Sequence, residues 1–574
     1  MNAFRHLRIQ EIAQLEKQLC LCSDWSKIQV SQDFQVSQLM RSSFKGSFRI
    51  NSGAIIEDST LTMTGNSSFG NGTVANVLDE SGTRSLILTQ NMNAQNAYLQ
   101  CFWKNDQNIS KLLMRLFKED ADSFFQDTME IGENASIRHC TNIENVQIGP
   151  YAVLNGVQKL INGTVLSSKD SPTTVGDNVI ARHFIIARGA SLTDGAQIEN
   201  CFVGENALVS KQFSATDSVI FANCQLLHGE ATAFFAGPST ISHHKNTLLI
   251  AATSLFFNAG SGSNQSNHMY KSGPIHYGIM DRGTKMASDS YIPWPSRIGS
   301  FSLIIGKHKN KLNTKDLPFS YLVAEGNTTR IIPAIALRNL GTFRDAAKWP
   351  KRDLRKVPHS DTVIYELLNP YTISQILSGF LLLQDLLDKN DEKLLYPYDN
   401  QHIYVTRDAA LRAISLYQKA LLIYCGTHVQ KGNVKKIEPW VDLGGLTTTF
   451  RQARRLLKNL NSLKQLNERI QELSFSYNLD NNRFASSLSG ILLNKESIDD
   501  NDVAYLKKKA NEEIATLKSE VLKDAKKEFD TIFKINYGID QGQMAQEKEF
   551  ELLRGKLNTE AIGSLIDDVL FKNK

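Results

Sequence analysis

The chain has 574 residues, of which 41% are hydrophobic and 21% are charged, and its formal net charge is +5. This length exceeds what one hydrophobic core supports and predicts several domain-sized units. The small net charge argues against a dedicated nucleic-acid-binding protein, and the most apolar stretch, residues 373–389, is too short and too polar to cross a membrane.

The N-terminal stretch and the cysteines both bear on the compartment. MNAFRHLRIQEIAQLEKQL spaces its apolar residues as an amphipathic helix does and lacks the apolar core of a signal peptide. We therefore expect residues 1–45 to form an N-terminal helical segment. The seven cysteines are scattered, without a CxxC pair, which favours reduced thiols over disulfides or a zinc site. Together these features predict a cytoplasmic protein.

A six-residue repeat runs through the first half of the chain. From Ile131 the sequence gives IGENAS and IRHCTN, then IGPYAV, VGDNVI and VGENAL, and each hexad opens on an aliphatic residue. Such hexads are typical of a parallel β-helix, in which the aliphatic residue points inward and Gly-Glu-Asn or Gly-Asp-Asn forms a tight turn. An all-β sandwich would instead show hairpin turns between alternating strands, and these are scarcer here. We predict a β-helix over residues 46–345, with a helical insertion near 95–125.

The second half of the chain has a different composition. From residue 361 glycine becomes rarer, and residues 411–424, 450–475 and 503–533 place apolar side chains three or four positions apart. This spacing predicts amphipathic helices that pack through their apolar stripes. Residues 346–574 are therefore predicted to form an α-helical domain, which follows the β-solenoid.

Several histidines gather in the later part of the predicted β-helix. His228, His243, His244, His268 and His276 fall within 49 residues, and the segment Ser266–Ile292 adds several charged groups and three glycines. Because the ordinary pKa of histidine is about 6.5, it suits general acid–base catalysis near neutral pH. The candidate catalytic residues are His244, His243, His276 and His268. Adjacent residues of a strand face opposite sides, so His243 and His244 are not expected to point the same way.

The same region supplies candidate substrate-binding groups. Basic side chains there suit the phosphates of a nucleotide or of coenzyme A, and carboxylates suit a sugar hydroxyl or a histidine. The candidates are Lys245, Asn264, Lys271, Asp281, Arg282, Lys285 and Asp289. An ordinary solvated loop is the alternative interpretation. A metal site is not predicted, because no HxH or HExxH spacing occurs.

Two resemblances add to this interpretation. Through residues 131–252 the chain is loosely similar to the left-handed β-helix (hexapeptide-repeat) acyltransferases. The blocks FAGPSTISHHKNTLLIA, NAGSGSNQSNHMYKSGPIHYG and GTFRDAAKWPKRD more closely resemble an uncharacterised bacterial left-handed β-helix family, sometimes labelled glucose-1-phosphate thymidylyltransferase-like. The first resemblance implies a left-handed helix, acyl or acetyl transfer with a histidine base, a coenzyme A thioester or carrier-protein donor, and a homo-oligomer, usually a trimer. Its acceptor would be a sugar or nucleotide-sugar.

Two other functions remain open. A non-catalytic β-helix scaffold that holds a ligand fits the irregular repeat after Val209, because regular coils form the donor groove of the transferases. Nucleotidyl transfer is the least favoured function. It needs a strand that runs into a Gly-rich phosphate-binding turn, and SGTRS at 81–85 has no such strand and helix around it.

Overall fold

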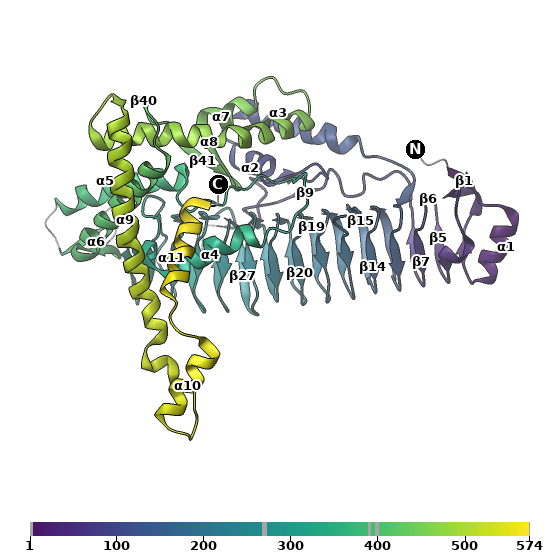
Figure 1. Ribbon diagram of the computed structural model, residues 1–574. Coiled ribbons are helices and arrows are strands. Elements are labelled where there is room, and N and C mark those ends of the chain that lie inside the picture. Colours follow the sequence, from purple (N-terminus) through teal and green to yellow (C-terminus); the bar gives the residue numbers. More distant parts are fainter. Residues whose placement is uncertain (1–3, 267–272, 389–391, 397–400, 573–574) are drawn as a thin grey trace.

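The computed structural model describes residues 4–266, 273–388, 392–396 and 401–572. Its strands stack into an elongated body, and the helices cover one side and one end of that body (Figure 1). The N-terminal half therefore consists of large, mainly parallel sheets, and the C-terminal region is helical, as the change in composition predicted.

The strands of the body form three stacks, which we call the first, second and third series. The chain contributes one strand to each series in that order and then begins the next turn of the body. The first series contains β3 (Ile28–Ser31), β6 (Phe48–Ile50), β11 (Met129–Ile131), β22 (Val219–Ile220), β25 (Phe235–Ala236), β28 (Ala252–Ser254), β31 (Gly278–Met280) and β34 (Arg297–Ile298), with β1 (Phe4–His6) antiparallel beside β3. The second contains β4 (Leu39–Met40), β7 (Ile55–Glu57), β12 (Ser136–Arg138), β14 (Val153–Asn155), β16 (Thr174–Val175), β18 (Ser191–Leu192), β20 (Leu208–Ser210), β23 (Gln225–Leu227), β26 (Ile241–Ser242), β29 (Asn258–Ala259), β32 (Lys285–Met286), β35 (Leu303–Ile305) and β36 (Tyr321–Glu325). The third contains β2 (Leu21–Cys22), β5 (Ser43–Lys45), β8 (Thr60–Thr62), β21 (Ser214–Thr216), β24 (Gly229–Thr232), β27 (Thr247–Ile250), β30 (Asn264–Ser266) and β33 (Tyr291–Pro293).

Four long strands join the third series to the first. They are β13 (Ile143–Ile148), β15 (Lys159–Val165), β17 (Ile180–Ile186) and β19 (Gln197–Val203). Each turns the corner at a residue with positive φ, namely Asn145, Asn162, His183 and Asn200. Asparagine tolerates this left-handed conformation better than most residues, so the sequence favours a corner at three of the four positions.

The repeat residues form the core of the body. Ile131 is paired in register with Ile148, and Ile148 with Val165, so the residue number rises by 17 at each of these two turns. The stack continues through Ile186 and Val203, and all five side chains are buried. Burying a stack of aliphatic side chains in this way is the main driving force for the body, at about 1.5–3 kcal/mol for each fully buried side chain.

The N-terminal segment differs from its expected helical structure. Residues 4–45 contain one α-helix, α1 (Ile9–Lys17), together with the strands β1 to β5, and β3 pairs in parallel with β6. The body therefore begins before residue 46. Its strands are short and follow no hexad, so the periodicity of the sequence does not mark them.

The helical insertion lies over the first series. It contains the hairpin β9 (Val74–Ala75) and β10 (Leu86–Ile87) and the helices α2 (Ala94–Phe102) and α3 (Gln107–Asp122). Leu99 and Leu116 of these helices belong to the same hydrophobic cluster as Ile185, Phe202 and Val219 of the body. The outer side of the first series is thus an apolar surface that a second layer covers.

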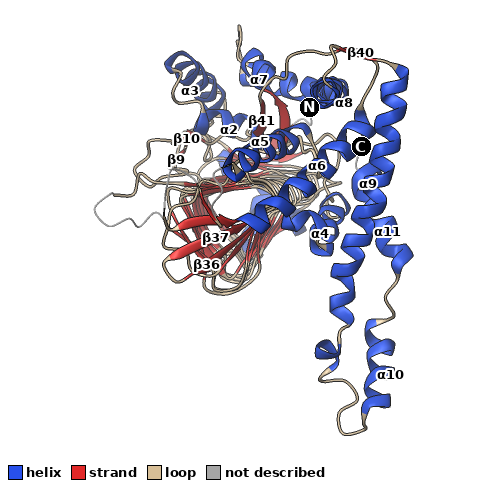
Figure 2. Ribbon diagram, turned by 90° about the vertical axis from the view of Figure 1, so that its left-hand side faces the viewer, coloured by secondary structure: helices blue, strands red, loops and turns tan. Residues whose placement is uncertain are grey.

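The C-terminal helices complete this cover and close one end of the body. They are α4 (Leu340–Lys351), α5 (Pro370–Leu387), α6 (Arg407–His428), α7 (Phe450–Leu456), α8 (Leu463–Leu493), α9 (Asp500–Lys526), α10 (Gln543–Arg554) and α11 (Thr559–Asp567). Figure 2 shows α9 running past the body, with α10 beyond its lower end. The apolar stripe predicted over 503–533 stays helical only to Lys526 and continues in 3-10 turns. Among the described residues, no helix has the length and apolar character needed to cross a membrane.

Further strands link the two halves of the chain. β37 (Thr328–Ile332) pairs with β36 and also with β39 (Ile403–Thr406), which pairs with β38 (Lys393–Leu395). The hairpin β41 (Trp440–Leu443) and β42 (Leu446–Thr449) lies among the helices, as does the pair β40 (Gly432–Asn433) and β43 (Ser497–Ile498). Residues 346–574 are therefore helical in the main, but they also extend the second strand series.

Candidate functional site

A cavity of about 380 Å³ lies on the outer side of the first strand series. Its floor is formed by Phe235, Thr253, Ile279 and Arg297, which are paired in register from β25 through β28 and β31 to β34. Side chains alternate along a strand, so the buried neighbours of these residues point inward while the four themselves point outward. We call this space the first-series cavity.

The cover over this floor is rich in aromatic side chains. Tyr98, Phe102 and Trp103 come from α2 and its C-terminal end, and Tyr371 and Trp440 come from α5 and β41. The rings of Tyr98 and Phe102 are stacked at 4.4 Å, and Phe102 meets Phe235 edge-on. A concave apolar wall with few polar groups is typical of small-ligand sites, and flat ring faces suit bases and the C–H faces of sugars.

The charged part of the cavity is one connected network. Asp281 Oδ1 accepts a hydrogen bond of 3.1 Å from the Tyr371 hydroxyl, and its Oδ2 accepts one of 2.9 Å from the Gln375 amide. Arg297 lies 3.5 Å from Asp281 Oδ2 and donates to the Tyr371 hydroxyl at 3.1 Å. The carboxylate of Asp281 raises the pKa of Arg297, so this cation stays charged at any physiological pH.

Asp281 and Arg297 differ in their freedom to bind a ligand. Asp281 is 7% exposed and its oxygens are already paired, whereas the side chain of Arg297 is 38% exposed. Among the described residues, no acceptor contacts Nη1 of Arg297. The guanidinium of Arg297 is therefore the charged group that can meet a ligand in this cavity.

Arg282 also lines the cavity, but it is fully engaged with the protein. Its side chain is 0% exposed, and Nε donates to Asp442 at 2.8 Å. Nη1 and Nη2 donate to the carbonyls of Ile364 and Gly445 at 3.1 and 3.2 Å. Arg282 thus fastens the β41–β42 hairpin to the body, which makes it a positioning residue rather than a ligand-binding one.

A second cavity of about 330 Å³ adjoins the first and shares Ile279 and Arg297 with it. It is also lined by His276, Tyr277 and Asn313. The Nε2 atom of His276 and the Oδ1 atom of Asn313 are buried and have no hydrogen-bond partner among the described residues. Unsatisfied buried polar atoms are rare in native proteins, so a pair of them beside a cavity is a feature of interest.

The other histidine candidates lie elsewhere. His243 and His244, with Lys245, form the exposed turn between β26 and β27, which joins the second series to the third. This corner is opposite the first series in each turn of the body. His243 Nε2 lies 2.7 Å from Gln225 Oε1, and partial burial lowers the pKa of His243. The predicted histidine cluster is therefore divided between two sides of the body.

The remaining candidates are similarly dispersed. Lys285 on β32 pairs with Asp345 of α4, and burial lowers its pKa to about 8. Asp289 pairs with Lys307 at 2.9 Å, and Asn264 lies on β30 in the third series. His268 and Lys271 lie outside the described residues. Of the predicted residues, the structure thus brings Asp281 and Arg282 together and places His276 beside them.

The aromatic residues and Arg297 were not predicted from the sequence. Arg297 lies in the part of the chain where the repeat is irregular, and Tyr98, Phe102 and Trp103 occur together in YLQCFW within the expected insertion. Three aromatic residues within six positions of an insertion were the one feature of the sequence that could have indicated this wall of the cavity. Trp440 and Tyr371 reach the cavity from distant parts of the chain, and no local pattern indicates that.

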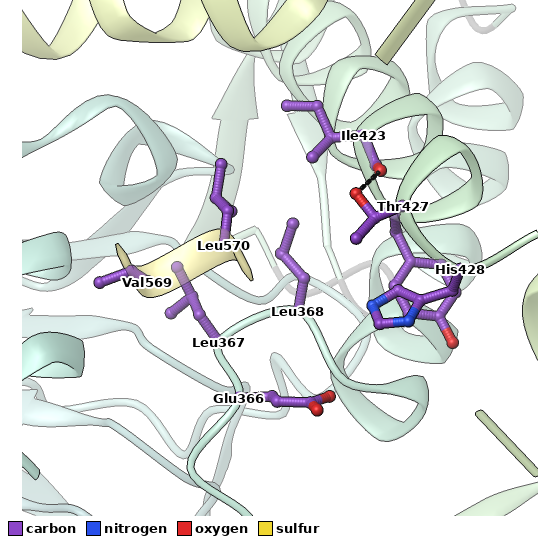
Figure 3. A pocket seen from close by; sticks show the side chains of 9 residues that line it. Glu366, Leu367, Leu368, Ile423, Thr427, His428, Val569 and Leu570 are labelled. Carbon is purple, nitrogen blue, oxygen red and sulfur yellow. Dashed lines mark hydrogen bonds between the residues drawn. The ribbon is translucent and has the colours of Figure 1, made fainter. Parts of the chain in front are cut away.

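A separate, smaller cavity lies between residues 366–368, which precede α5, the C-terminal part of α6, and residues 569–570 near the C-terminal end (Figure 3). Glu366, His428 and several aliphatic side chains line it, and Thr427 donates to the Ile423 carbonyl at 2.7 Å. Its volume of about 20 Å³ is enough for a water molecule but not for a substrate. We do not consider it a ligand site.

The comparisons with known proteins cover both halves of the chain. Residues 4–53 and 47–387 match the family described as Domain of unknown function (DUF4954), and residues 426–570 match that described as Domain of unknown function (DUF6819). An uncharacterized protein of Treponema pallidum (strain Nichols) is 25% identical over 442 residues, which is 67% of this chain and 59% of that relative. The chain thus spans 59% of the length of this curated relative. The first-series cavity takes its floor from the first matched region and Trp440 and Asp442 from the second.

Proposed function

This chain belongs to the family described as Domain of unknown function (DUF4954), and we propose that it binds a sugar or nucleotide-sugar in the first-series cavity. The cavity volume of about 380 Å³ lies within the range of about 300–1,000 Å³ that small-ligand sites occupy. The observation that carries the proposal is the half-exposed guanidinium of Arg297 among aromatic side chains. Aromatic faces suit a sugar or a base, and a guanidinium suits a phosphate.

Acyl or acetyl transfer is the reaction that we propose for this ligand, with His276 as the general base. Nε2 of His276 would remove a proton from an acceptor hydroxyl or amine as that group attacks the carbonyl carbon of a coenzyme A thioester. The carbon–sulfur bond then breaks, and the proton on His276 can pass to the departing thiolate. The unpaired Nε2 atom beside the cavity supports this assignment over His243 and His244, which lie on the opposite corner.

The proposal also covers the architecture and the setting of the protein. We propose that the three strand series wind as a left-handed β-helix, which the 17-residue spacing and the asparagine corners support. A cytoplasmic location is supported by the seven unpaired cysteines, of which six are buried. A homo-oligomer, with a trimer as the expected form, belongs to the same proposal.

The second candidate function is a non-catalytic ligand-binding scaffold. One observation favours it: among the described residues, no carboxylate lines the cavity beside His276, whereas catalytic histidines are commonly held by such a partner. In that case the cavity would bind its ligand without turnover.

Calorimetry and a turnover assay separate these functions. We expect UDP-N-acetylglucosamine or a dTDP-sugar to bind the full chain, and Arg297→Gln to weaken binding by tenfold or more, since a charged hydrogen bond contributes about 1.5–3 kcal/mol. Release of coenzyme A from acetyl-coenzyme A should be lost in His276→Ala and unchanged in His244→Ala, its matched control. Binding without thiol release would support the scaffold. Failure of every sugar nucleotide to bind, or equal binding by Arg297→Gln, would refute the site.

A further inference from the structure

A basic cavity of about 170 Å³ lies in the C-terminal region and is separate from the first-series cavity. The segment that follows β40 forms one wall, and α7 and α8 form the others. Five of its lining residues are cationic and two are acidic, which leaves a net charge of +3; they are Lys435, Lys436, Arg451, Arg455 and Arg483, with Glu438 and Asp480. We call this space the basic cavity.

The two acidic residues are already engaged. Glu438 pairs with Arg451, and Asp480 accepts hydrogen bonds of 3.2 Å from Arg483 and 2.6 Å from Gln452. In the described part of the chain, no acidic side chain pairs with the other three cations, which are Lys435, Lys436 and Arg455. Three neighbouring cations without counter-charges repel one another, and an anion between them would relieve that repulsion.

The lysines are held in place by their backbone. Val434 donates to the carbonyl of Glu496 at 2.9 Å and packs closely against Gly490 of α8. The amide of Lys435 donates to Ser487 Oγ at 3.4 Å. The two lysines therefore extend from a fixed segment rather than from a free loop, so little ordering would be needed before an anion binds.

We propose that the basic cavity binds a compact phosphate-bearing anion, with Lys435, Lys436 and Arg455 as its ligands. Ammonium and guanidinium groups make their strongest hydrogen bonds to such oxygens. The volume of about 170 Å³ is below the usual range of about 300–1,000 Å³ for small-ligand sites, so one or two phosphate groups fit and a whole nucleotide does not. The aromatic residues at its wall, Trp440 and Phe484, are 7% and 4% exposed and offer no open face for a base.

This site is independent of the proposed sugar site, although Trp440 lines both cavities. The side chain of Trp440 packs edge-on against Phe484 at 5.9 Å, on the wall of the basic cavity. Occupation of the basic cavity should therefore change the fluorescence of Trp440. That signal does not require any ligand in the first-series cavity.

Titration of the full chain with inorganic pyrophosphate at constant ionic strength tests the proposal. We expect saturable binding by calorimetry with a change in tryptophan fluorescence. The double variant Lys435→Ala/Lys436→Ala should bind at least tenfold more weakly, and Arg455→Gln should also weaken binding. The matched control is Lys507→Ala/Lys508→Ala, an adjacent exposed pair on α9 that should leave affinity unchanged.

Three results would overturn the proposal. Equal weakening by both double variants would show a general charge effect, and pyrophosphate binding unaffected by the cavity variants would place the anion elsewhere. Tighter binding of a short single-stranded RNA than of pyrophosphate, lost in the same variants, would identify a nucleic-acid surface instead. Thermal unfolding of each variant without ligand verifies that the folded protein is compared throughout.

Discussion

Burial sets the protonation of single residues in this protein, and His308 is the clearest case. It is 1% exposed, its Nδ1 lies 2.9 Å from Thr329 Oγ1, and burial lowers its pKa to about 4. The unfolded chain binds a proton at this residue below about pH 6.5, whereas the folded chain does not until about pH 4. Stability contributed by neutral His308 is therefore lost as the pH falls from about 6.5 to about 4.

Replacing His308 should remove this pH dependence. Each pKa unit corresponds to about 1.4 kcal/mol, so protonation opposes folding by about 3 kcal/mol at the acidic end of the window. We expect His308→Asn to be less stable than the natural protein at pH 7.5 and to approach or exceed its stability at pH 4.5. Urea unfolding at both pH values measures this. If the natural protein and His308→Asn lost the same free energy of unfolding between pH 7.5 and pH 4.5, the prediction would be wrong. His244→Asn, at an exposed histidine, serves as the control.

Single residues also show what the sequence could and could not predict. Asp281, Arg282 and His276 were candidates because they lie in a polar segment between apolar strands. Their different roles depend on partners that no local pattern indicates, since Arg282 is paired with Asp442 160 residues away. Arg297 was overlooked because an arginine where the repeat is irregular resembles any solvated strand residue.

Among the elements, the β41–β42 hairpin determines whether the first-series cavity exists. The sequence WVDLGGLTTT carried a signal for it, because two glycines between strand-forming residues favour a two-residue turn. The prediction of a helical domain passed over this signal. The helices themselves followed from their apolar stripes, since that periodicity is local and strong.

The Arg282–Asp442 pair should be essential to the position of this hairpin. Removing one partner of a buried ion pair leaves an uncompensated charge and costs about 3–5 kcal/mol. We expect Asp442→Asn to lower stability by about this amount and to abolish ligand binding in the first-series cavity. The double variant Arg282→Met/Asp442→Leu should recover part of the stability, because no charge is left buried.

Thermal unfolding of these variants gives the comparison. The control is Arg41→Met, which breaks ion pairs with Asp58 and Glu57. The side chains of Arg41, Asp58 and Glu57 are 42%, 30% and 25% exposed, so this loss should cost less than about 1 kcal/mol. Equal losses for Arg41→Met and Asp442→Asn would show that Arg282 and Asp442 do not fasten the hairpin.

At the scale of the whole molecule, a ligand-sized cavity exists on one side of the parallel β body because two segments cover that side. These are the helical insertion and the C-terminal region, which are far apart in the sequence. The hexads predicted the body, since each repeat residue stacks on its copy one turn away. They did not predict which side would be covered. That depends on the apolar outer residues of β17, β19 and β22, which sequence alone does not assign to a series.

A crystal structure of the full chain soaked with UDP-N-acetylglucosamine tests the central claim most directly. The account predicts density for the ligand in the first-series cavity, with a phosphate near Arg297 and a ring against Trp103. Density at the exposed corner of His243 and His244, with the first-series cavity left empty, would contradict it.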